Sequence, residues 1–257
     1  MTSLTLFVKA FNAGQLRQVD ELLQEQFKDL DVEAKVVANP TSKWVQVFLE
    51  GEDEVIAAAY ARKEIGTCPV SLDNIEVGSV LRGYVSKVDE SRGQLTVDVG
   101  VFEPKVTQAT LPLVTLRSQL STGKDVGLKA IGEAYGIAEG MPISVKVTSK
   151  EAESLTAELS SEQVEKLKGW QQSLLDRLII LRAPKELVTS TLERTRLDRD
   201  VIDVEQLGFF EFALTCKLGT DARGLVPRVG RYMRNAVFVV FNAERSLIFV
   251  GGQGLSL

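Results

Sequence analysis

The stretch from Val80 to Val101 reads VLRGYVSKVDESRGQLTVDVGV. It is rich in valine and other strand-forming residues over Val80–Val88 and again over Gln94–Val101, which predicts two strands. The tripeptide Ser91-Arg92-Gly93 lies between them and predicts the hairpin turn that joins them. This hairpin opens a series of strands that continues to Ser160.

Three more strands follow the hairpin. The sequence predicts them over Val106–Leu113, Pro142–Val147 and Ser154–Leu159. The insertion after the first of these holds a short helix near Val126–Tyr135. Five strands with a helix between the third and the fourth are the order of an oligonucleotide-binding (OB) barrel. We therefore expect a central OB-fold domain over residues 76–160.

Several short motifs in this segment resemble those of the S1 RNA-binding domain, which has an OB fold. They occur in the S1 order and are Gly78–Val85, Asp98–Gly100, Leu111-Pro112 with Leu116 and Leu120, Gly140–Ile143 leading into Val145–Val147, and Ala157–Ser160. The whole chain is also similar to a family of uncharacterised archaeal proteins that carry such a segment between two smaller parts. The resemblance implies a β-barrel that contacts RNA.

RNA-binding S1 domains usually carry exposed aromatic rings beside basic residues. The matching candidates here are Tyr84 and Phe102, with Arg82 and Lys105 nearby. Bases stack on such rings, at about 1–3 kcal/mol per base. One alternative is that the barrel binds RNA weakly or docks protein instead. Another is that each ring simply packs into the barrel or against its neighbours.

The flanking parts predict two α/β domains, so the expected fold class is α+β. Residues 1–75 follow the order β-α-β-β-α, with Val70–Leu72 as a closing strand, which is typical of a ferredoxin-like domain. Residues 161–257 predict a helical and α/β domain. Its expected elements are an amphipathic helix with its N-cap at Ser161 and its end near Ala183-Pro184, a helix over Lys185–Arg194, strands over Val201–Val204 and Phe212–Lys217, a short helix over Gly224–Met233, a hairpin of Ala236–Phe241 with Ser246–Val250, and a loose tail at Gly251, Gly252 and Gly254.

The charge is unevenly distributed among these parts. The formal net charge of −5 divides into −5 over residues 1–75, −2 over 76–160 and +2 over 161–257. One segment is strongly basic, because Lys217, Arg223, Arg228, Arg231 and Arg234 stand there against the single acid Asp221. Arginines beside an aromatic residue, here Tyr232, can pair with phosphates and stack on bases. The alternative is an ordinary solvated face, or arginines that pair with acids elsewhere, such as Glu205 and Glu211.

Composition excludes the common catalytic arrangements. The chain has no histidine and two cysteines, Cys68 and Cys216, so it contains no Ser-His-Asp triad, no Cys-His pair and no cysteine-rich zinc site. Two cysteines are too few for a disulfide framework, which favours a cytoplasmic location. Three acids near the start of the expected strand Val201–Val204 are interleaved with arginines: Asp198, Asp200 and Asp203. This pattern predicts a charged segment at the start of a strand rather than a metal cluster. We expect neither a cofactor nor a membrane segment.

These patterns predict a non-catalytic protein that binds RNA or a ribonucleoprotein, for instance as a ribosome-associated or RNA-processing factor. The barrel and the basic C-terminal part would contact RNA, and the acidic N-terminal domain would bind protein or mediate self-association. The first alternative is a protein-interaction adaptor, for example of the transcription machinery, whose barrel does not bind RNA. The second is an enzyme that uses carboxylates and a metal.

Overall fold

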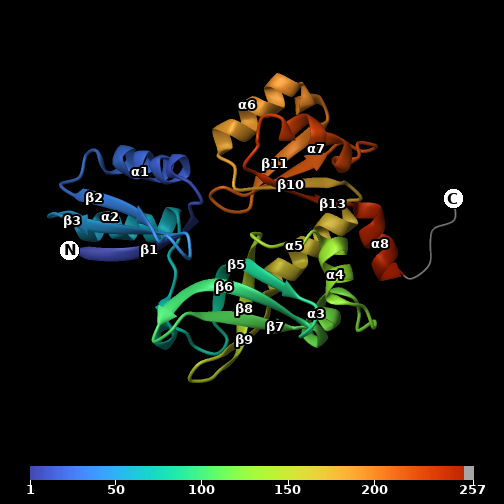
Figure 1. Ribbon diagram of the computed structural model, residues 1–257, viewed down its shortest axis with the longest axis horizontal. Helices are drawn as coiled ribbons and strands as arrows, with labels where there is room; N and C mark the ends of the chain where they lie inside the picture. Colours follow the sequence, from blue (N-terminus) through green and yellow to red (C-terminus); the bar gives the residue numbers. More distant parts are fainter. Residues whose placement is uncertain (252–257) are drawn as a thin grey trace. The chain divides into compact units, whose positions relative to one another are not determined.

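The computed structural model describes residues 1–251, with the backbone alone at Val250 (Figure 1). The chain forms two compact units. The first contains Met1–Asn74 with Gly100–Val106, and the second contains Ile75–Val99 with Thr107–Leu257. The domain limits expected from the sequence, 1–75, 76–160 and 161–257, stay predictions.

The N-terminal sheet is antiparallel, with the strand order β1-β3-β2. Its elements are β1 (Thr2–Lys9), α1 (Ala13–Phe27), β2 (Glu33–Ala38), β3 (Trp44–Glu50) and α2 (Glu54–Glu64). Asn12 begins α1, because its side chain accepts a hydrogen bond from the Gln15 N–H at 2.9 Å. Trp44 and Leu49 of β3 are fully buried in the core of this unit.

The fourth position of this sheet differs from the prediction. Gly66–Cys68 runs beside β1: the Phe7 N–H donates to the Gly66 carbonyl and the Cys68 N–H to the Thr5 carbonyl, both at 2.8 Å. Pro69 has no N–H with which to extend this ladder, and Val70 has a left-handed φ of 63°. The expected closing strand over Val70–Leu72 is therefore wrong. Val70–Ser71 forms β4, which pairs in parallel with β6.

The central part is a closed five-stranded barrel of the OB-like type. Its sheet order is β6-β5-β8-β9-β7, and a β6–β7 pairing closes it. The strands and the two helices of the insertion are β5 (Val80–Asp89), β6 (Gln94–Glu103), β7 (Thr107–Pro112), α3 (Leu113–Leu120), α4 (Leu128–Tyr135), β8 (Pro142–Lys150) and β9 (Leu155–Leu159). The structure confirms the five expected strands and adds α3, which the sequence reading missed.

One glycine of the S1-like motif has a packing role in this barrel. A Cβ atom on Gly83 would lie 2.5 Å from the Val97 side chain and 2.8 Å from the Asp98 carbonyl oxygen. Since β5 and β6 approach this closely, only glycine fits at position 83 without a shift of β6. Barrel packing therefore requires the glycine that this motif carries at position 83.

The C-terminal part is a three-layer α/β/α arrangement around an antiparallel sheet of order β11-β12-β10-β13. Helices α6 and α7 cover one face, and α5 and α8 the other (Figure 1). The elements are α5 (Ser161–Gln172), β10 (Arg177–Leu181), α6 (Lys185–Thr195), the 3₁₀ helix η2 (Leu197–Arg199), β11 (Val201–Gln206), β12 (Phe212–Cys216), α7 (Ala222–Gly230), β13 (Val237–Phe241) and α8 (Ala243–Gly251). Leu178 and Ile180 point into the α6–α7 core.

The expected helix from Ser161 to near Ala183-Pro184 is wrong in its second half. Helix α5 ends at Gln172, and Leu174 takes a left-handed φ of 55°. Arg177–Leu181 is the strand β10, which lies between β12 and β13 and is buried at all five positions. A strand buried on both faces lacks the polar alternation that distinguishes a strand from a helix.

The expected C-terminal hairpin is half correct. β13 is a strand, whereas Ser246–Val250 belongs to helix α8. Asn242 begins that helix, because its side-chain oxygen accepts a hydrogen bond from the Arg245 N–H at 2.8 Å. Of the predicted loose tail, Gly251 ends α8, and Gly252 and Gly254 lie outside the described residues.

Candidate nucleic-acid interface

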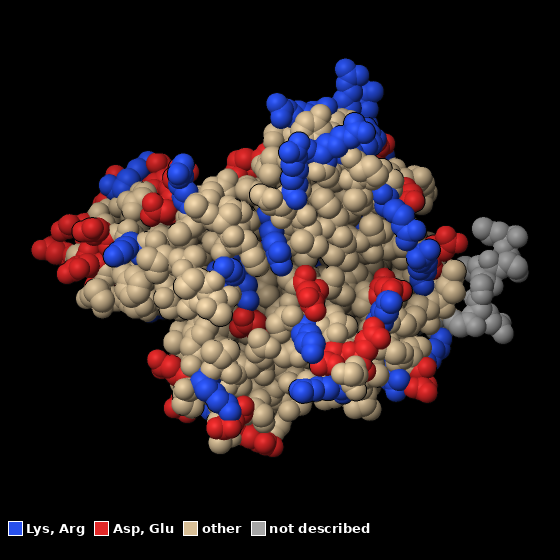
Figure 2. Space-filling model, in the orientation of Figure 1, with Lys and Arg blue, Asp and Glu red and all other residues tan. Residues whose placement is uncertain are grey.

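Basic side chains gather on the outer surface of the C-terminal part, over α6 and α7 (Figure 2). Two segments that are distant in sequence supply them: the end of α6 and the end of α7. We call the set the arginine face, and its members are Arg194, Arg196, Arg228, Arg231 and Tyr232. All five are exposed, including Tyr232 at 45%.

Direct contacts hold the two segments together. Arg228 of α7 donates a hydrogen bond to the Thr195 carbonyl, which is exposed at the end of α6, at 2.6 Å. The Arg194 guanidinium lies 5.8 Å from the centre of the Tyr232 ring, which is within cation–π range. Helix α6 ends there because Arg196 takes a left-handed φ of 55°. The arginine face is therefore part of the folded domain rather than a loose basic loop.

The acids that border this face leave most of its charge uncompensated. Asp200 forms an exposed ion pair with Arg228 at 3.4 Å. Among the described residues, Arg194, Arg196 and Arg231 have no acidic partner. Guanidinium groups that project into solvent in this way can pair with phosphate oxygens in a bidentate manner.

The acidic run beside the arginine face is divided among η2, β11 and the residue between them. Asp198 lies in the 3₁₀ helix η2, Asp203 in β11, and Asp200 between them faces Arg228. Within residues 1–251, no three acidic, cysteine or histidine side chains come together as a metal-binding group.

The structure divides the predicted basic segment into separate parts. Arg228 and Arg231 share a side of α7, as their spacing predicts. Arg223 stands five residues before Arg228, about 140° around the helix, and lines a cavity elsewhere. Lys217 belongs to the turn before α7, where its carbonyl accepts the Thr220 N–H. Arg234 is exposed in the turn that follows Tyr232.

The candidate residues on β5 have different environments. Tyr84 is 3% exposed, and its hydroxyl donates to the Glu211 carboxylate at 3.4 Å. Tyr84 therefore presents no ring for base stacking, and the packed alternative applies to it. Arg82 is exposed and donates to the Leu207 carbonyl at 3.4 Å. Both residues join the barrel to the C-terminal part.

Glu211 is the most buried carboxylate at this junction, with 1% exposure. Burial raises its pKa to about 7, although the Phe210 N–H, the Tyr84 hydroxyl and the guanidinium groups of Arg182 and Arg82 favour the charged form. The Phe210 N–H donates to the same carboxylate oxygen as Tyr84 does. A titratable group therefore lies inside the contact between barrel and C-terminal part.

Phe102 and Lys105 belong to the other compact unit. Phe102 is half-buried in β6, and Lys105 is exposed in the turn before β7. Their role in RNA contact stays a prediction.

Family models match nearly the whole chain. The DUF2110 N-terminal domain matches residues 3–71, the DUF2110 central domain residues 75–171, and the DUF2110 C-terminal domain residues 175–241. The chain belongs to the DUF2110 family. The barrel lies in the central domain, and the arginine face lies in the C-terminal domain.

Two solved structures show distant similarity to this DUF2110 protein. The intact alpha subunit of aIF2 from Pyrococcus abyssi is 10% identical, with a TM-score of 0.26, and the match covers 65% of this chain and 97% of that one. A protein from Thermus thermophilus is 12% identical, with a TM-score of 0.17, and the match covers 98% of this chain and 43% of that one. Such scores do not show a shared fold. No curated protein matches the sequence.

Two of the five residues in the arginine face, both in the DUF2110 C-terminal domain, are not predicted from the sequence. Arg194 and Arg196 lie more than 30 positions before Arg228 and are surrounded by acids, so a local charge count hides them. One local signal does point to them: the sequence predicts a helix that ends at Arg194, and the C-terminal end of a helix favours cations. Only the packing of α6 against α7 brings the two segments together.

Proposed function

We propose that this protein binds RNA, free or within a ribonucleoprotein such as the ribosome, without catalysing a reaction. The observation that carries the proposal is the arginine face. It combines four exposed guanidinium groups with a half-exposed tyrosine ring. Phosphates pair with the guanidinium groups, and an unpaired base can stack on the ring.

The barrel supports the proposal of an RNA partner through its fold type alone, and not through a binding site of its own. OB barrels are a common architecture for single-stranded nucleic acid, and the sequence motifs of this barrel resemble those of S1 domains. The barrel's own stacking platform is thin, because Tyr84 is buried. We therefore assign the main contact to the C-terminal part, with Arg82, Phe102 and Lys105 as candidates for additional contacts.

The finer assignments belong to the same proposal. We propose a ferredoxin-like N-terminal domain that binds protein or mediates self-association, since its net charge of −5 disfavours phosphate. An S1-type barrel, an archaeal source and a cytoplasmic location are also proposed. Within residues 1–251, no helix combines the length and apolar character needed to cross a membrane.

Recovery of the protein from its native cells at low salt tests this function. We expect RNA or ribosomal particles to accompany it and to leave as the salt concentration rises, because each phosphate contact displaces counterions. The matched sample is treated with ribonuclease before recovery. Proteins that stay bound after this treatment, with no RNA in the untreated sample, would instead favour the protein-interaction adaptor.

A further inference from the structure

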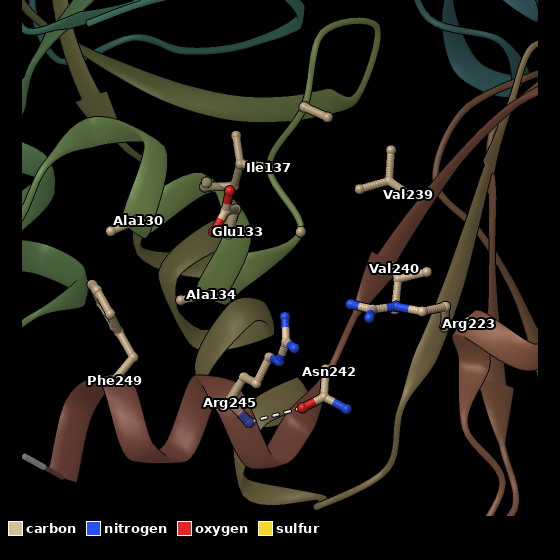
Figure 3. A pocket seen from close by; sticks show the side chains of 13 residues that line it. Ala130, Glu133, Ala134, Ile137, Arg223, Val239, Val240, Asn242, Arg245 and Phe249 are labelled. Atoms are coloured by element: carbon tan, nitrogen blue, oxygen red, sulfur yellow. Dashed lines mark hydrogen bonds between the residues drawn. The ribbon is translucent and has the colours of Figure 1, made fainter.

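A cavity of about 520 Å³ lies between the barrel insertion and the C-terminal sheet, within the second compact unit. Its walls come from α4 and the turn after it, from the start of α7, from β13 and from α8 (Figure 3). Small-molecule sites typically measure about 300–1,000 Å³. The cavity is thus large enough for a ligand.

Two arginines from different helices line this cavity. Arg223 comes from the first turn of α7 and Arg245 from the first turn of α8. Figure 3 shows both guanidinium groups directed toward the same space. Among the described residues, neither side chain has a hydrogen-bond or ion-pair partner. Two arginines against one lining acid, Glu133, favour an anionic ligand at this cavity.

A single carboxylate fixes the backbone from which both arginines project. Asp176 accepts hydrogen bonds from the Ala243 N–H at 3.0 Å and from the Ala222 N–H at 3.4 Å. It also accepts from the Asn242 side chain at 3.1 Å. Asp176 therefore ties the first residues of α7 and α8 to one another. This fixes the backbone from which Arg223 and Arg245 project, so that ligand binding has to order only the two side chains.

The rest of the lining is mostly apolar. Ala130 and Ala134 of α4 and Val239 of β13 form the wall, and the Phe249 ring borders it. Tyr135 fixes that ring by an edge-to-face contact, with 6.3 Å between the centroids. Glu133 is the one acid among the lining residues, and a carboxylate can accept hydrogen bonds from sugar hydroxyls. The cavity thus offers its two arginines to an anionic group, the Phe249 ring to a flat group and Glu133 to a hydroxylated group.

We propose that this cavity binds a nucleoside monophosphate unit. A phosphate monoester carries about −1.5 to −2 charge at neutral pH, and Arg223 and Arg245 bind it. The base lies against the apolar wall and Phe249. A free mononucleotide and the terminal nucleotide of an RNA strand present the same unit. The cavity shares no residue with the arginine face, so either site can fail without the other.

Calorimetric titration with AMP and UMP tests the cavity, with adenosine and inorganic phosphate as the component probes. We expect a monophosphate to bind about 10-fold or more tightly than either component, because the site contacts both parts of it. Arg223→Gln and Arg245→Gln should each weaken that binding about 10-fold. Lys168→Gln, at an exposed position of α5, should leave it unchanged.

A second variant tests the apolar wall without altering charge. Ala130→Leu fills part of the cavity and should also weaken AMP about 10-fold, while the thermal midpoint stays within a few degrees. Absence of monophosphate binding at about 5 mM overturns the proposal. So does binding that survives both arginine substitutions.

The source of the unit is assigned with short RNAs that carry a 5′- or 3′-phosphate. Competition by these ends, lost in Arg223→Gln, supports an RNA terminus as the ligand. Binding of free mononucleotides without such competition supports a free nucleotide. Charge reversal in the arginine face should leave mononucleotide binding intact in both cases, which keeps this result separate from the proposed function.

Discussion

Replacing Arg228 and Arg231 together by glutamate should weaken binding of single-stranded RNA by about 100-fold or more at low salt. Each substitution removes a phosphate partner and adds a like charge, and the two side chains share one side of α7. Fluorescence polarisation with a labelled RNA of mixed sequence measures the effect. Arg231→Glu alone should cost about half of the binding free energy that the double substitution costs.

The fold should survive these substitutions. Arg228 gives up a half-exposed ion pair with Asp200 and an exposed hydrogen bond to the Thr195 carbonyl. Such pairs contribute about 0–1 kcal/mol and a typical hydrogen bond about 0.5–1.5 kcal/mol. The matched control reverses Lys129 and Lys168, which are exposed on α4 and α5 and give the same change in net charge. Equal losses in both double variants would mean that net charge alone governs binding, and the arginine face would lose its role.

Replacing Glu211 by glutamine should make the protein more stable above neutral pH, by about 1–3 kcal/mol. The wild-type carboxylate is 1% exposed, and its folded pKa of about 7 lies above the value in an unfolded chain. Glutamine keeps an acceptor for the Tyr84 hydroxyl and the Phe210 N–H without the buried charge. Urea unfolding at pH 5, 6, 7 and 8 measures the difference.

The sign of this pH dependence follows from proton binding. Between about pH 4.5 and 7 the folded protein holds a proton on Glu211 that the unfolded chain has released, so stability falls as pH rises through this window. The lowered pKa values of Glu54 and Asp89 act in the opposite direction, at more acidic pH. Glu193→Gln, at an exposed position of α6, is the control. A wild-type decline that persists in Glu211→Gln would show that another group titrates.

Local patterns predicted most of the elements. The five barrel strands, α6, α7 and β13 follow from strand and helix periodicity together with turn residues. The errors occur where packing on both sides removes the pattern. Arg177–Leu181 is buried on both faces of a sheet, so its apolar run resembles a helix as closely as a strand. The α8 segment was misread because its start depends on one capping side chain, Asn242.

The candidate site was predictable only in part, because surfaces are assembled from distant segments. The spacing of Arg228 and Arg231 showed the α7 half of the arginine face, whereas Arg194 and Arg196 join it through tertiary packing. Tyr84 matched the S1 pattern, yet its environment depends on Glu211, 127 positions away in the chain. The cavity lined by two arginines depends on Asp176, whose contacts with two helix starts no local motif shows.

The most direct test of RNA binding is the salt dependence of the affinity of the purified protein for single-stranded RNA. With four arginines in contact with phosphates, the logarithm of the association constant should fall linearly with the logarithm of the salt concentration, with a slope of about −3. In the double variant Arg228→Glu/Arg231→Glu the slope should be markedly less negative. Absence of binding at about 50 mM salt, or a slope near zero, would contradict an RNA partner held by the arginine face.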